Sequence, residues 1–166
     1  MKSRCETILV CVFACVTVIL AGFLFYTVYV WTGTGVLLQN LDENFSVDSV
    51  EVYPSIDYTT VNATITVSNT FLGSYMRLYI VLWALNVNGT EVLLSDRAGN
   101  QVPGTVAGIL VYPLSSGTVG MYFNVSSNSV TIQTPRNLMF IFRVTARTIV
   151  TENRAHYPID IYKLYQ

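Results

Sequence analysis

Few side chains in this chain of 166 residues could act as catalysts or metal ligands. It has a single histidine, His156, and one histidine cannot form the pair that zinc sites commonly use. Neither a G-x-S-x-G motif nor a phosphate-binding glycine loop is present. Four carboxylates could offer oxygens to calcium, but their spacing does not match an EF-hand loop: Asp42, Glu43, Asp48 and Glu51. We therefore expect no catalytic site, no metal and no cofactor, and interpret these acids as a solvated strand edge.

The cysteines also argue against a chemical site. Cys5, Cys11 and Cys15 all lie at the start of an N-terminal apolar run or inside it, and no cysteine follows. The rest of the chain therefore has neither a disulfide framework nor a cysteine-based metal site. Cys5 beside Arg4 could be S-acylated in the cytoplasm, but the favoured interpretation is a small apolar residue.

Four N-x-[ST] sequons are the remaining modification signal. They begin at Asn44, Asn62, Asn88 and Asn124, all after the apolar run. Such sequons accept glycans only in exported segments, so together they favour an exported, glycosylated domain.

Composition excludes another class of partner. Only 11% of residues are charged, 52% are hydrophobic and the net charge is −1. A nucleic-acid-binding domain would show a basic patch, so we expect no nucleic-acid partner.

The N-terminal run has the length of a membrane span. No residue from Thr7 to Trp31 is charged. A helix of about 24 residues is about 36 Å long, which is enough to cross a hydrocarbon core of about 30 Å. Cleavage at Ala21-Gly22 would leave an exposed apolar N-terminus, so a simple signal peptide is not expected.

Charges around the run predict its orientation. Lys2 and Arg4 precede it, and the first charges after it are acidic. The positive-inside rule therefore places the N-terminus in the cytoplasm and the following domain outside. The predicted organisation is a basic N-terminus at 1–6, a helix at 7–31, a glycine linker at 32–40 and a β-domain at 41–166.

Small residues within and after the helix suggest two further roles. Ala14, Ala21 and Gly22 would let neighbouring helices approach closely, which drives association in an apolar medium. Gly33 and Gly35 are expected to end the helix just outside the membrane and to act as a hinge on which the domain swings.

Beyond Gly35 the pattern indicates strands. Val61–Ser68 alternates between apolar and polar residues, and in Phe140–Arg147 alternate apolar residues share a face opposite Arg143, Thr145 and Arg147. Eight or nine such runs, Val130–Thr134 among them, are separated by turn-forming residues. They predict a mainly β fold, an immunoglobulin-like antiparallel β-sandwich preceded by one long N-terminal hydrophobic helix.

One strand departs from this alternation. Leu78–Leu85 is apolar on both faces. It is either a central strand with aromatic residues on its outer face, or a strand whose outer face packs on a neighbouring subunit or on the N-terminal helix. The sequence leaves these two alternatives open.

In layout the chain resembles the archaeal type IV pilins and related surface filament subunits. VTVILAGFLFYTVYVWTGTG is similar to their N-terminal helix, and VNATITVSN at Val61–Asn69 to the first strand of their β-domain. The resemblance implies a structural protein that starts in the cytoplasmic membrane and polymerises with copies of itself into a cell-surface filament. It also implies peptidase cleavage before the helix, at Lys2-Ser3 or Arg4-Cys5.

A second resemblance implies a different behaviour. Thr66-Val67-Ser68-Asn69 is similar to the V-x-V-x-N strand end of late-embryogenesis-abundant type 2 sandwiches, which also follow a single span. That family implies a monomeric, membrane-anchored domain with a binding or protective role.

Overall fold

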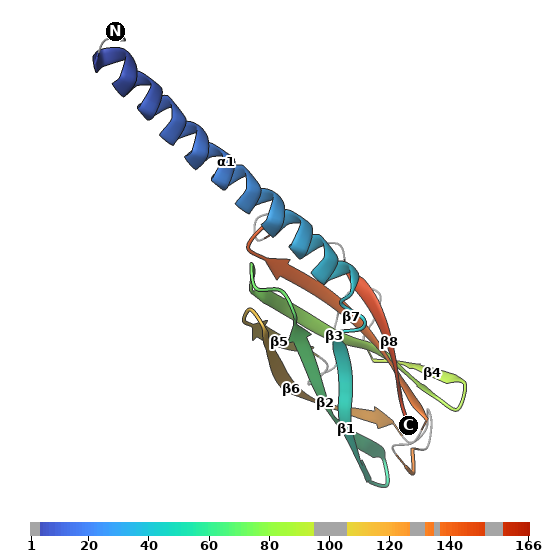
Figure 1. Ribbon diagram of the computed structural model, residues 1–166. Coiled ribbons are helices and arrows are strands. Elements are labelled where there is room, and N and C mark those ends of the chain that lie inside the picture. The colour runs from blue at the N-terminus through green and yellow to red at the C-terminus, as the bar shows by residue number, and fades with distance from the viewer. Residues whose placement is uncertain (1–3, 95–105, 127–131, 135–136, 152–157) are drawn as a thin grey trace.

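The computed structural model describes residues 4–94, 106–126, 132–134, 137–151 and 158–166. It consists of one long helix, α1 (Arg4–Gln39), which leads into a two-layered β-sandwich (Figure 1). The strands are β1 (Phe45–Pro54), β2 (Tyr58–Asn69), β3 (Met76–Val87), β4 (Thr90–Leu93), β5 (Val106–Val111), β6 (Ser115–Ser126), β7 (Leu138–Thr148) and β8 (Ile159–Tyr165). The predicted fold class, a long apolar helix followed by an antiparallel β-sandwich, is confirmed.

The strands form two antiparallel sheets. Sheet A has the order β1-β2-β6, and sheet B the order β4-β3-β7-β8, with β5 also paired to β3. Strand β2 shows how the sequence builds this arrangement, because its alternate residues Val61, Ala63, Ile65 and Val67 are all buried. The polar residues between them lie on the outer face of the sheet.

A cluster of phenylalanines lies at the centre of the core. Phe142 stacks on Phe140 with ring centroids 5.8 Å apart, and it packs on Phe45 from the other sheet at 5.0 Å. All three side chains are essentially inaccessible to solvent. The sandwich is therefore joined across its two layers by aromatic packing.

The apolar strand β3 has a simple explanation. Leu78, Ile80 and Leu82 face the core, while Tyr79 and Trp83 lie on the outer side. Arginines of β7 cover these two rings, with Arg143 4.2 Å from the centroid of Trp83 and Arg147 5.4 Å from that of Tyr79. The first alternative, a central strand with aromatics on its outer face, accounts for this strand.

The predicted end of the helix is wrong. Instead of stopping at Trp31 before a linker at 32–40, α1 continues through Gly33 and Gly35 to Gln39. The reason is burial, because Leu37 and Leu41 are only 2% and 0% exposed and belong to the core of the sandwich. Burying two leucines contributes about 3–6 kcal/mol, which exceeds the cost of about 1 kcal/mol for each helical glycine.

One predicted strand is also not found. In the run Val130–Thr134 the structure describes residues 132–134, and none of these is in a strand. Ile132 is nevertheless fully buried in the core. Its apolar character therefore reflects core packing, which a short β-rich pattern cannot distinguish from strand formation.

Candidate functional site

The most unusual surface of the molecule is the N-terminal part of α1. Between Ile8 and Tyr29 its large apolar side chains are exposed to solvent. By length and composition, Glu6–Gln39 is long and apolar enough to cross a membrane, and no other helix in the described part of the chain is. Such a surface requires lipid or other apolar surfaces to cover it.

The small residues of α1 lie on one side of this exposed rod. At 3.6 residues per turn, Ala14, Ala21 and Gly22 share one face with Cys11 and Cys15. Ala14 and Gly22 are exposed, and apart from the neighbouring helix backbone no atom lies within 4 Å of the position that a Cβ on Gly22 would occupy. A shallow apolar depression of about 360 Å³ on this face is lined by Ala14, Cys15, Val18 and Ile19. The face can therefore admit a neighbouring helix, as small residues in membrane helices do.

The joint between helix and sandwich is built around Phe71. This residue lies in the β2–β3 loop, and its ring centroid is 5.2 Å from that of Tyr29. A Cβ on Gly33 would overlap the Phe71 ring, and one on Gly73 would come within 2.6 Å of it. The two glycines thus form a slot for the aromatic ring, so Gly33 serves close packing within a helix and not its termination.

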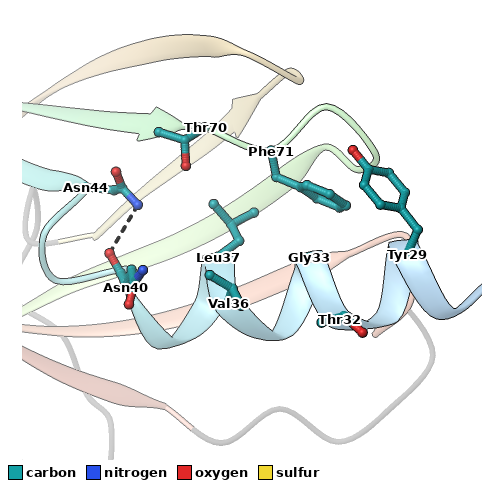
Figure 2. A pocket seen from close by; sticks show the side chains of 9 residues that line it. All are labelled: Tyr29, Thr32, Gly33, Val36, Leu37, Asn40, Asn44, Thr70 and Phe71. Atoms are coloured by element: carbon teal, nitrogen blue, oxygen red, sulfur yellow. Dashed lines mark hydrogen bonds between the residues drawn. The ribbon is translucent and has the colours of Figure 1, made fainter.

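Beside this slot lies an open groove of about 510 Å³ (Figure 2). Figure 2 shows residues from the end of α1 along one side and Thr70 and Phe71 along the other. The Asn44 side-chain amide donates a hydrogen bond of 3.1 Å to the Asn40 carbonyl oxygen. The groove is lined by Tyr29, Thr32, Gly33, Val36, Leu37, Asn40, Asn44, Thr70 and Phe71. None of these nine residues carries a charge.

We predict that Gly33→Ala lowers the free energy of unfolding by about 1–3 kcal/mol, as overpacking of a filled site does. The matched control is Gly35→Ala, two residues further along α1. Because no atom lies within 4 Å of a Cβ at Gly35, this control is expected to be neutral or stabilising by up to about 1 kcal/mol. Guanidinium unfolding of the detergent-solubilised chain measures both. Equal stability of the two variants would show that the Phe71 ring does not fill the space at Gly33.

The four predicted glycosylation residues lie at three different places. Asn44 is in the turn between α1 and β1, and Asn88 is exposed at the tip of the β3–β4 hairpin with a positive φ of 51°. Asn62 and Asn124 share the outer face of sheet A, where Asn124 is exposed and its side-chain oxygen accepts a hydrogen bond from Thr60. The hairpin tip and this outer face of sheet A are therefore the most open positions.

The four carboxylates do not form a site. Asp42 forms an ion pair of 3.0 Å with Lys163, and Glu51 accepts a hydrogen bond from the Tyr53 hydroxyl. The hydroxyl of Ser46 donates a 2.6 Å hydrogen bond to Asp48, and this bond lowers the pKa of Asp48. No group of three or more His, Cys, Asp or Glu residues in the described ranges could hold a metal ion. His156 lies outside the described residues.

Two features of the structure were not found by sequence reasoning. The first is the Phe71 slot, whose only sequence signal is a pair of glycines at Gly33 and Gly73. The second is a pair of arginines, Arg77 and Arg147, that are directly opposite each other on β3 and β7. Neither could be deduced without the strand register, because each joins residues far apart in the chain.

Comparison with known proteins identifies no family. No protein-family model matches the chain, and no curated protein matches it in sequence. Among solved structures, a protein from Archaeoglobus fulgidus aligns at 12% identity and a TM-score of 0.38, over 71% of this chain and 93% of its own. A β-glucosidase from Paenibacillus barengoltzii aligns at 13% identity and a TM-score of 0.29, over 74% of this chain but only 15% of the enzyme. A β-glucosidase from Kluyveromyces marxianus aligns at 11% identity and a TM-score of 0.26, over 71% of this chain and 14% of the enzyme. Likenesses this distant carry no functional conclusion.

Proposed function

We propose that this chain is a non-enzymatic structural protein of the cell surface, a pilin-like subunit that polymerises through α1 into an extracellular filament. Before assembly α1 crosses the cytoplasmic membrane, with Lys2 and Arg4 inside and the sandwich outside. An N-terminal apolar helix joined to a β-domain is compatible with a membrane-anchored protein and with a pilin-like one. We propose in addition that copies of the chain assemble into a filament.

The observation that carries the proposal is the continuity of α1. A helix of 36 residues, about 54 Å long, is exposed and apolar at one end and buried in the core of the sandwich at the other. With no break at the glycines, every copy holds its sandwich in the same orientation relative to its helix. A regular assembly with repeated head-to-tail contacts requires such identical geometry.

The small-residue face of α1 supplies the contact between copies. Ala14, Ala21 and Gly22 allow close approach of helix backbones, and the larger apolar residues around them complete the packing. The sandwiches would then lie outside this helical core, with Asn62, Asn88 and Asn124 as candidate glycan carriers. In this arrangement the partner of the protein is a second copy of itself, and no nucleic acid takes part.

A second candidate function is a monomeric, membrane-anchored sandwich with a binding or protective role. The observation that favours it is the outer face of β3, where Arg143 and Arg147 already lie over Trp83 and Tyr79. A strand covered in this way needs no neighbouring subunit.

The deciding experiment is electron microscopy of material sheared from cells that produce the chain, with mass spectrometry of the same fraction. We expect filaments that contain this chain, with an N-terminus that begins after Ser3 or after Cys5 if a peptidase acts there. Mass spectrometry of the four sequon peptides reports glycosylation in the same sample. Recovery only from detergent-solubilised membranes, as a monomer, would contradict the filament and support the anchored sandwich.

A further inference from the structure

Three loops gather at the end of the sandwich from which α1 emerges (Figure 1). They are residues 70–75 between β2 and β3, residues 112–114 between β5 and β6, and residues 149–151 after β7. Met76 is paired with both Val111 and Thr148, which places all three loops at the same end of sheet B. Phe71 in the first of these loops contacts Tyr29 of α1. The loops therefore lie beside the last residues of the apolar run, on its predicted outer side.

Hydrogen bonds connect these loops to one another. The buried Asn69 side-chain nitrogen donates to the carbonyl oxygen of Ser74 at 2.8 Å and to that of Val111 at 3.4 Å. The Ser74 hydroxyl in turn accepts a hydrogen bond of 3.2 Å from the backbone nitrogen of Ile149. The three loops therefore form one connected platform, which the contact between Phe71 and Tyr29 holds against α1.

This platform presents apolar side chains to its surroundings. Four of its apolar residues are each between 53% and 64% exposed: Leu72, Tyr112, Leu114 and Ile149. Loop tips of a domain that contacts only water are normally polar. Aromatic and aliphatic side chains at the outer end of a membrane helix instead favour the interfacial layer of the bilayer.

Two arginines lie next to the platform. Arg77 and Arg147 are directly opposite each other on β3 and β7, an arrangement that is unfavourable for two like charges. Within the described ranges neither forms an ion pair, and the Nε of Arg147 is buried with no hydrogen-bond partner. Arg143, four residues before Arg147 on β7, differs because Asp160 neutralises it in an ion pair of 2.9 Å. Among the residues that the structure describes, the pair therefore has no anionic partner.

We propose that this end of the sandwich rests in the headgroup layer of the membrane that α1 crosses, with Arg77 and Arg147 binding lipid phosphate. Arginine forms paired hydrogen bonds with phosphate oxygens, and one phosphate between two arginines removes their repulsion. The depth is consistent, because a helix of about 20 residues ending at Tyr29 spans about 30 Å, the thickness of the hydrocarbon core.

The inference rests on the proposed membrane span of α1 and adds a lipid contact for the exported domain. A second copy of the chain would also cover apolar loops. The bilayer is the better occupant because the loops are continuous with the apolar surface of α1 and stand at its outer end. Arg77 and Arg147, which form no ion pair within the described part of the chain, also match an anionic lipid surface in charge.

The test uses spin labels on the full chain in phosphatidylglycerol vesicles, with Cys5, Cys11 and Cys15 replaced by alanine. Labels are attached to cysteine at Leu114, at Leu72, and at Ile56, which is 92% exposed in the β1–β2 hairpin at the opposite end. We expect labels at Leu114 and Leu72 to collide several-fold less often with a water-soluble nickel chelate than the label at Ile56. Leu114 accessibility equal to that of Ile56, or spin–spin broadening that reveals a second copy at the platform, would overturn the inference.

The arginines are tested in the same vesicles. Combining Arg77→Gln with Arg147→Gln is expected to raise the nickel accessibility of the Leu114 label, whereas Arg143→Gln leaves it unchanged. No effect of the double substitution would overturn the phosphate contact. A label at Leu20 tests the membrane span separately: if it is lipid-buried while Leu114 is in water, only this inference fails. If Leu20 itself is in water, the membrane span and this inference fail together.

Discussion

Phe142→Ala is expected to destabilise the sandwich by about 3–5 kcal/mol, the range found for removing a fully buried aromatic ring. The ring of Phe142 is inaccessible to solvent and packs on both Phe140 and Phe45, so its removal leaves a cavity between the two sheets. Small domains are stable by only about 5–15 kcal/mol, so this loss is a large share of the total. Guanidinium unfolding of the detergent-solubilised chain, followed by near-ultraviolet circular dichroism, measures it.

The matched control is Tyr122→Ala on the outer face of sheet A. This ring is also removed from a strand, but 60% of the residue is exposed. Its loss is expected to change the free energy of unfolding by less than about 0.5 kcal/mol. Similar losses for the two variants would mean that the aromatic cluster is not the centre of the core.

Gly22→Leu is expected to abolish filaments while leaving the folded subunit intact. Apart from the neighbouring helix backbone, no atom lies within 4 Å of the position of its Cβ, so a leucine has open space there and improves helix propensity. Between copies the same leucine would fill the gap through which helix backbones approach each other. Electron microscopy of sheared material, beside quantification of the chain in the membrane fraction, separates loss of assembly from loss of protein.

Leu20→Phe is the control for this substitution. It also adds bulk to an exposed position of α1, but on the side of the helix opposite Gly22. Filaments should persist in this variant. Normal filaments in Gly22→Leu, or their loss in both variants, would exclude the small-residue face as the specific contact.

Much of the fold could be predicted because its signals are local. The alternation in Val61–Ser68 predicts β2, and Asn88-Gly89 provides the two positive φ angles, 51° and 87°, that a tight hairpin requires. The apolar run predicts a helix, since a segment of that length without charges has few alternatives. Each of these patterns is contained in a window of a few residues to about two dozen.

The joint could not be predicted in the same way. Gly33 and Gly35 are alike in the sequence, yet only Gly33 faces Phe71, which is 38 residues further along the chain. The pairing of Arg77 with Arg147 depends likewise on the register of β3 against β7. Residue type and spacing say nothing about such contacts.

The sequence by itself therefore determined a long apolar helix and a β-sandwich, because hydrophobic period and residue type act locally. Only the tertiary structure decided where the helix ends and what its glycines do. Leu37 and Leu41 are buried in a core that distant strands supply, and this burial keeps the chain helical past Gly33 and Gly35. By local preference alone, these two glycines would be expected to end the helix. The reason is that the free energy of burial depends on which surfaces meet in the folded chain, and local preferences of about 1 kcal/mol yield to it.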